Sequence, residues 1–210
     1  MSEQPSGALG SGDPGRGIVA PATDPQALKT TRYRPAFHRA ADFRCAKSPR
    51  VQGFLTGDYQ RFAKTNYCKA LILPNPDDET GIWRYYTLSP YKIEPQELSR
   101  KQRGAFRGSL PIPMILVGFM GKDDSAPPRL GEALLVVTAR RVYRSDDTAA
   151  AALILESEGG PGTRLYEWYG DTMKFEPIRR PDPNKKKSMI ETGVLFCPLA
   201  SLIPEEWPGN

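Results

Sequence analysis

The stretch that most constrains the fold runs from Leu110 to Arg144, where an apolar segment, a short polar loop and an amphipathic helix follow one another. Residues 112–120 are apolar on both faces, which is typical of a strand buried inside a sheet. Asp, Ser and Pro residues at 123–128 then force a turn, and the helix that follows ends on arginines. Such a unit can aim backbone N–H groups at a phosphate. On this stretch alone, an ordinary packing unit of an α/β core is the simpler interpretation.

The rest of the chain predicts further strands and short helices around this unit. Segments 67–73 and 82–88 predict a hairpin, because the strong turn signal Asn75-Pro76-Asp77-Asp78 separates them. Residues 40–62 carry apolar side chains three and four apart, which predicts a helix broken near Pro49. Three more strands are expected at 151–156, 173–178 and 193–199, with a short helix over 163–169 begun by Thr163. This order predicts an α+β fold with a mixed central sheet flanked by helices.

The two ends of this pattern define the expected domain. Residues 1–31 are rich in Gly, Pro and Ser and show no periodicity. Such a segment buries too little apolar surface to offset its ordering entropy, so a flexible N-terminal tail is predicted. The folded domain is expected to span residues 32–205.

Composition narrows the compartment and the kind of chemistry. No apolar run is long enough to span a membrane and no secretory signal pattern is visible, so a cytoplasmic protein is expected. The three cysteines are widely spaced, which is typical of free thiols in a reducing cytoplasm. The one histidine, His38, is expected to be structural, and no metal site is predicted. The net charge of +5 favours phosphate-bearing partners, either a nucleotide cofactor or a nucleic acid.

Six short segments follow one another in a characteristic order. They are FHRAADFRCAKSPRVQGFL (Phe37–Leu55), RYYTLSP (Arg84–Pro90), LPIPMIL (Leu110–Leu116), LGEALL (Leu130–Leu135), LYEWYG (Leu165–Gly170) and LFCPLASL (Leu195–Leu202). Together they resemble the acetyltransferases of bacterial toxin–antitoxin modules, a branch of the GNAT superfamily with motifs such as GYYTLS, PIPVI, FYExYGF and LFLPLATL. The resemblance implies a GNAT-like fold and acetyl-CoA as the acyl donor.

The resemblance also implies where acetyl-CoA binds. The donor's pantetheine arm would lie along the end of the central strand, and its pyrophosphate at the loop that opens the following helix. The residues implied are Met120, Gly121, Lys122, Arg129, Leu130 and Gly131. The loop departs from the family pattern, because two prolines remove N–H donors and Arg129 replaces a glycine. Arg129 is expected to meet the pyrophosphate with its guanidinium, unless the site is inactive.

A tyrosine in the LYEWYG segment carries the implied catalytic role. By resemblance to FYExYGF, Tyr166 takes the position of the tyrosine that protonates the departing CoA thiolate. A phenol with an ordinary pKa near 10 is protonated at neutral pH and can donate to a developing anion. The alternative is an aromatic side chain that only packs on the sheet.

The same resemblance implies the acceptor and the partners. Enzymes of this branch acetylate the α-amino group of aminoacyl-tRNA, which blocks translation, pair with a ribbon-helix-helix antitoxin and form homodimers. Basic residues that could follow an RNA backbone, or could simply be solvated, are Arg100, Lys101, Arg103, Arg107, Lys185 and Lys186. The predicted function is therefore a toxin-type N-acetyltransferase. The alternative is a pseudo-enzyme that keeps the fold as a protein- or nucleic-acid-binding module.

Overall fold

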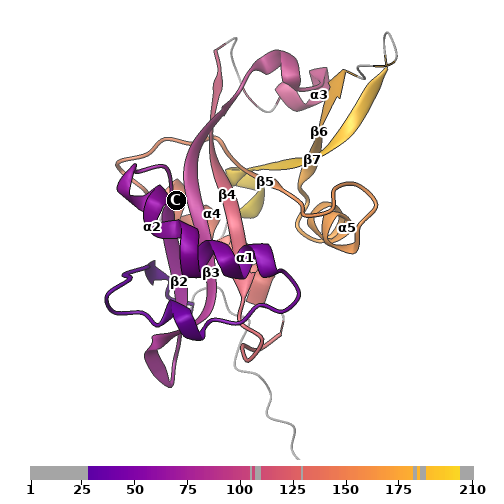
Figure 1. Cartoon of the computed structure of the whole chain (residues 1–210). Helices are drawn as coiled ribbons and strands as arrows, with labels where there is room; N and C mark the ends of the chain where they lie inside the picture. Colours follow the sequence, from indigo (N-terminus) through magenta and orange to yellow (C-terminus); the bar gives the residue numbers. More distant parts are fainter. Residues whose placement is uncertain are drawn as a thin grey trace, which may run out of the picture.

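A mixed seven-stranded sheet forms the centre of the molecule (Figure 1). The computed structural model describes residues 28–104, 106, 110–128, 130–181, 184 and 188–203. The strands are β1 (Thr31–Arg32), β2 (Lys69–Asn75), β3 (Asp78–Ile93), β4 (Ile112–Lys122), β5 (Ala152–Glu156), β6 (Glu176–Pro181) and β7 (Met189–Pro198). Their spatial order is β1-β2-β3-β4-β5-β7-β6. All neighbouring pairs are antiparallel except β4 and β5, which run parallel.

Short helices cover both faces of this sheet. They are η1 (Ala40–Asp42), α1 (Pro49–Gly53), η2 (Phe54–Asp58), α2 (Tyr59–Lys64), η3 (Pro95–Glu97), α3 (Arg100–Arg103), α4 (Leu130–Tyr143), α5 (Arg164–Asp171) and α6 (Leu199–Leu202). Tyr85 and Tyr86 of β3 point to opposite faces, because side chains alternate along a strand. Tyr85 joins the core cluster beneath α1, η2 and α2, and Tyr86 joins the one beneath α4, α5 and α6. The sheet is therefore buried on both faces, as the apolar β4 segment predicted.

The predicted fold class, a mixed sheet flanked by helices, is confirmed. The helix break expected near Pro49 is also present, since Pro49 occupies the first turn of α1. The strand expected from residue 173 instead begins at Glu176. That prediction was wrong at its start because Met173 and Phe175 are apolar for another reason. Both are buried in the core between α5 and the sheet.

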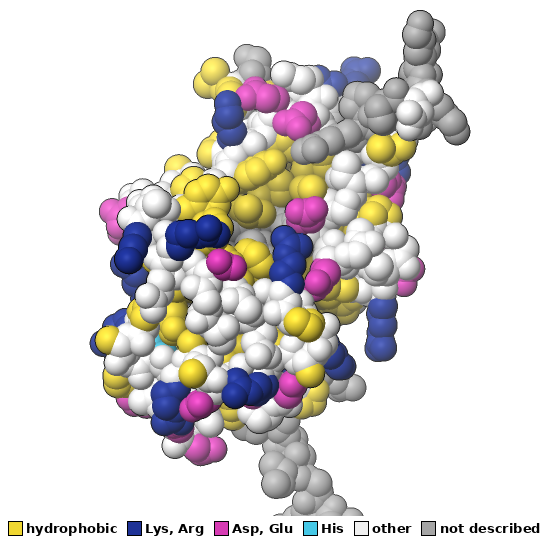
Figure 2. All heavy atoms as spheres, in the orientation of Figure 1, with side chains coloured by type: hydrophobic (Ala, Val, Ile, Leu, Met, Phe, Trp, Pro, Cys, Tyr) yellow, Lys and Arg dark blue, Asp and Glu magenta, His cyan; other side chains and the backbone are white. Residues whose placement is uncertain are grey.

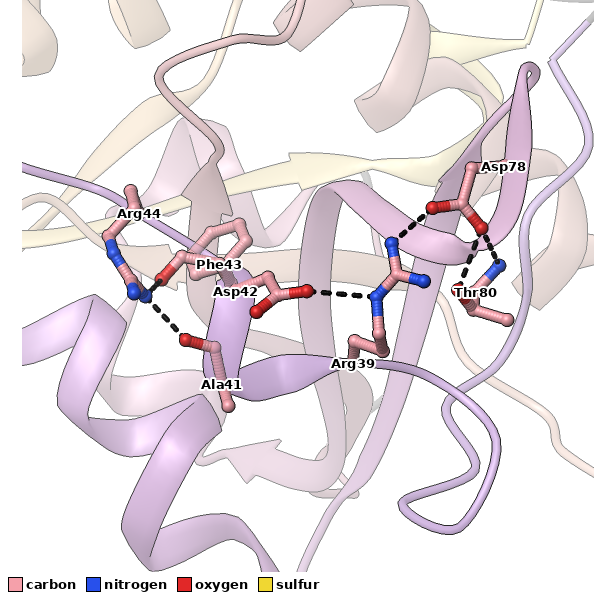
Figure 3. Close-up of polar contacts among 7 residues, drawn as sticks. All are labelled: Arg39, Ala41, Asp42, Phe43, Arg44, Asp78 and Thr80. Carbon is pink, nitrogen blue, oxygen red and sulfur yellow. Dashed lines mark hydrogen bonds and ion pairs between the residues drawn. The ribbon is translucent and has the colours of Figure 1, made fainter.

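Exposed ion pairs and hydrogen bonds tie the segment before α1 to the β2–β3 turn (Figure 3). Arg39 Nε donates to Asp42 Oδ2 at 2.8 Å, and its Nη2 also donates to Asp78. Asp78 Oδ1 in turn accepts from the Thr80 hydroxyl at 2.7 Å. Because such exposed pairs contribute little each, they position this segment rather than hold the fold together.

The one histidine and the three cysteines are all buried in the protein. His38 is buried, its Nδ1 accepts the Arg34 N–H at 2.9 Å, and burial lowers its pKa. All three cysteines are free and buried. In the described part of the chain, no helix is long and apolar enough to cross a membrane, and no group of His, Cys, Asp or Glu could hold a metal ion. Of the predicted tail, residues 1–27 lie outside the described residues.

Candidate active site

The candidate site is the cavity that opens where β4 and β5 separate. The two strands pair only over Met114–Val117 and Ala152–Leu155. Beyond this, β4 continues to Lys122, whereas the chain after β5 turns away through glycines with positive φ into α5. The cavity has a volume of about 550 Å³. Figure 2 shows hydrophobic side chains exposed in a hollow on this side of the molecule.

A β-bulge shapes the β4 wall of this cavity. The β3–β4 register shifts between Tyr86 and Leu88, which leaves Thr87 opposite the bulge. Thr87 is buried, and its Oγ1 accepts the Phe119 N–H at 2.9 Å. A Cβ on Gly118 would lie 2.7 Å from the same oxygen, so only glycine fits there. Since bulges bend the strand that carries them, this one explains how β4 departs from β5.

The opposite wall of the cavity contains a serine, Ser157, whose side-chain hydroxyl makes no hydrogen bond to the described residues. Ser157 follows β5 and is only 3% exposed, and its backbone N–H donates to the Gly193 carbonyl at 2.8 Å. Ser157 lines the cavity, and its Oγ is enclosed by protein, without a hydrogen-bond partner among the described residues. Because buried hydroxyls are nearly always paired, this unpaired oxygen is an unusual feature of the cavity wall.

Two tyrosines, Tyr166 and Tyr169, lie on one face of α5. Thr163 caps α5 by accepting the Tyr166 N–H at 3.3 Å, as the sequence predicted. Tyr166 and Tyr169 are three residues apart, so they share a helix face. Tyr169 is buried and borders the cavity, whereas Tyr166 is half-buried and does not line it.

The Tyr166 hydroxyl is engaged by a carboxylate. It donates to Glu191 Oε2 at 3.3 Å, and Glu191 also pairs with Arg179 at 2.7 Å. Burial raises the pKa of Tyr166, and the negative charge of Glu191 raises it further. Burial alone raises the pKa of Tyr169 to about 12. Both phenols are therefore protonated at neutral pH and can donate a proton or a hydrogen bond.

The residues predicted along β4 are not all directed at the cavity. Met120 lines it. Gly121 is buried against the Tyr85 ring on the other face of the sheet. The Lys122 ammonium donates to the Asp123 and Ala126 carbonyls at 2.8 and 2.9 Å, so it closes the turn after β4.

The residues predicted at the helix after β4 begin α4. Leu130 is its first residue and is buried, and Gly131 lies beside the Trp168 ring. Arg129 lies outside the described residues. A role in donor binding stays a prediction for all of them.

The predicted nucleic-acid contacts are only partly described. Arg100, Lys101 and Arg103 are exposed on α3, which packs beside β6 through a 3.1 Å bond from Gln102 to the Pro177 carbonyl. The other three predicted contacts, Arg107, Lys185 and Lys186, lie outside the described residues.

Arg84 is the buried residue that sequence reasoning missed. It lies on β3 and is 7% exposed, and its Nε has no hydrogen-bond partner among the described residues. Burial lowers its pKa to about 10. The available signal was an arginine in RYYTLSP at the position where the family motif GYYTLS has glycine.

The comparison with solved structures identifies the fold. AtaT complexed with acetyl-methionyl-tRNAfMet superposes with a TM-score of 0.64 at 22% identity, over 83% of this chain and 96% of AtaT. A tyrosine-to-phenylalanine mutant of KacT gives 0.65 at 21% identity, over 83% and 96%. AtaTR bound with AcCoA gives 0.59 at 21% identity, over 83% and 95%. The chain has the GNAT-like fold of AtaT and KacT. No family model and no curated protein matches the sequence.

Proposed function

We propose that the chain is an acetyl-CoA-dependent N-acetyltransferase of the toxin type, which acetylates the α-amino group of aminoacyl-tRNA. The observation that carries the proposal is the cavity between β4 and β5, which Met120, Ser157 and Tyr169 line. The shared fold supports it, since AtaT has been solved with acetyl-CoA and with an acetylated methionyl-tRNA. The resemblance adds an antitoxin partner, as AtaT has with AtaR.

The cavity and the neighbouring helix α5 carry groups suited to acyl transfer from a thioester. In this reaction a carbon–nitrogen bond forms as the carbon–sulfur bond breaks, the amine loses a proton and the thiolate gains one. A protonated tyrosine of α5, Tyr166 or Tyr169, supplies the proton to the thiolate. Glu156 and Glu158 line the same cavity, and their carboxylates can bind the ammonium form of the incoming amine, which gives up one further proton to water before its nitrogen attacks.

The acceptor would approach past α3. The exposed α3 residues Arg100, Lys101 and Arg103 provide positive charge next to the β6–β7 end of the sheet. Such a surface attracts a phosphate backbone without reading its sequence. This suits a tRNA that is recognised by its aminoacylated end and its overall shape.

The test is transfer of a labelled acetyl group from acetyl-CoA to aminoacyl-tRNA, with deacylated tRNA as the matched substrate control. If Tyr166 is the general acid, Tyr166→Phe lowers kcat about 10²- to 10⁴-fold with little change in KM. Tyr169→Phe measures the contribution of the second phenol, and Tyr143→Phe, on an exposed tyrosine at the end of α4, is the control. Absence of both acetyl-CoA binding and acetyl transfer would overturn the proposal and favour a binding module.

A further inference from the structure

A second cavity lies beside the C-terminal end of α4, apart from the candidate active site. It has a volume of about 550 Å³ and shares no lining residue with the cavity between β4 and β5. Strands β1 to β4 contribute residues to it, and the last turn of α4 and the chain up to Thr148 contribute the rest of one wall. The proposed acetyl transfer makes no use of this cavity.

The floor of this second cavity is apolar. Leu71 of β2, Leu88 of β3 and Ile115 of β4 line it, and all three belong to the core cluster on the α4 side of the sheet or pack against it. Val142, in the last turn of α4, lines it from the helix. Helix α4 ends at Tyr143 and Leu88 is only half-buried, so the helix leaves part of the apolar sheet uncovered. Such a surface favours a ligand with an apolar body.

Three positively charged side chains line the same cavity. Arg32 lies directly opposite Leu71 in the β1–β2 register, and Lys69 lies opposite Leu88 in the β2–β3 register. Because opposite residues share one face of a sheet, both charges lie beside the apolar floor. Arg141 of α4 adds the third charge from the helix.

Carboxylates of the protein do not balance these charges. No aspartate or glutamate is among the described residues that line the cavity, and none of the ion pairs in the described part of the chain involves its three cations. The Lys69 ammonium donates to the Asn66 side-chain oxygen, and Arg141 Nη2 donates to the Thr30 carbonyl at 2.7 Å. Both acceptors are neutral, so the positive charges favour an anionic ligand.

The other negative groups near this end of α4 are too weak to take the place of that ligand. Asp146 and Asp147 follow the helix, are exposed to solvent and do not line the cavity. Their charges are therefore screened by water and salt. The C-terminus of α4 carries partial negative charge, which Arg140 in its last turn offsets.

We propose that this second cavity binds a small amphipathic carboxylate, such as a medium-chain fatty acid. Its apolar body would lie on the floor formed by Leu71, Leu88 and Ile115, and its carboxylate would meet Arg32 and Lys69 at the edge of that floor. Arginine suits this role, because its planar fork bonds both carboxylate oxygens. The site does not depend on the acetyltransferase proposal.

The size and lining of the cavity favour this ligand over other anions. A volume of about 550 Å³ is in the range of small-molecule sites, which are mostly apolar with a few polar groups that fix orientation. A strongly hydrated polyanion would lose its water against the apolar floor without enough polar partners in return. A single carboxylate on an apolar chain places each part of the ligand against matching side chains.

The experiment measures binding to the full chain by calorimetry, with three ligands. Octanoate has both the apolar chain and the charge, octanamide has the chain without the charge, and acetate has the charge without the chain. Arg32→Met and Lys69→Met remove the charges, and Ser145→Trp fills the cavity from its helix wall. Thr148→Trp is a second filling variant, at an exposed position.

Two controls separate binding from general effects. Arg39→Met removes one exposed positive charge at a surface ion pair that does not line the cavity. Circular dichroism and melting temperature establish that each variant is folded.

We expect octanoate to bind the wild type, and octanamide and acetate to bind at least about tenfold more weakly, because each lacks one half of the interaction. Arg32→Met and Lys69→Met should each weaken octanoate about tenfold, since a hydrogen bond to a charged group is lost. The two filling variants should abolish octanoate binding, and Arg39→Met should bind it like the wild type.

Three results would overturn the proposal. Octanoate affinity that is unchanged in a folded filling variant would place binding elsewhere on the protein. Octanamide that binds as tightly as octanoate would remove the role of the basic residues, and with it the choice of a carboxylate. Absence of octanoate binding at millimolar concentration would exclude the site itself. None of these results bears on acetyl transfer, so the two proposals can fail separately.

Discussion

The Thr87–Phe119 bond is the most direct test of how the cavity is built. Thr87→Val keeps the shape of the side chain and removes the oxygen that accepts the Phe119 N–H at 2.9 Å. Thr87 is 2% exposed, so water cannot easily take the place of that oxygen. An unpaired buried donor costs about 1–3 kcal/mol, and Phe119 is only half-buried, so we expect about 1–2 kcal/mol of lost stability.

The assay is thermal unfolding followed by circular dichroism. For a domain of this size, the expected loss corresponds to a fall of about 2–8 °C in melting temperature. Thr56→Val is the control, because its hydroxyl bonds the Gln52 carbonyl at an exposed position and its loss should cost less than about 0.5 kcal/mol. Acetyl-CoA affinity should fall in Thr87→Val but not in Thr56→Val, since the bulge at Thr87 shapes the cavity. A melting temperature unchanged within about 1 °C would refute the role assigned to this hydroxyl.

Two further substitutions test packing and proton transfer. Gly121→Ala places a Cβ 2.6 Å from the Tyr85 ring, so over-packing should cost about 1–3 kcal/mol in urea unfolding; wild-type stability would contradict the close packing. Glu191→Gln leaves burial as the cause of the raised Tyr166 pKa but removes the contribution of the carboxylate, so that pKa falls. A phenol donates only while protonated, so the alkaline limit of acetyl transfer should move to lower pH. An unmoved limit would exclude Tyr166 as the acid.

Local sequence signals were sufficient for the strand, turn and helix at the centre of the chain. The apolar run that became β4 and the prolines before α4 leave few alternatives. The turn at Asn75–Asp78 likewise determined the β2–β3 hairpin, and Thr163 determined the start of α5. Each of these features depends on residues close together in the chain.

The parts of the site that were not predicted depend on residues far apart in the chain. The cavity exists because β4 and β5 separate after Val117 and Leu155, and no local pattern reports that separation. Arg84 is buried only because α4 covers β3, although its sequence segment is otherwise apolar and aromatic. Gly121 was expected beside the ligand; a side chain at this position would face Tyr85 on the opposite side of the sheet, so a role in donor binding is left to its backbone and stays a prediction.

The separation of β4 and β5 also bears on how such a protein can diverge. The cavity is made by two backbones that part, rather than by small side chains in an otherwise filled core. Many of the residues that line it can therefore be exchanged while the opening itself persists, and a new substrate does not require a new fold. Such an architecture can persist while most of the sequence changes. At 22% identity, with no family model matching, the likeness to AtaT is still evident in its backbone.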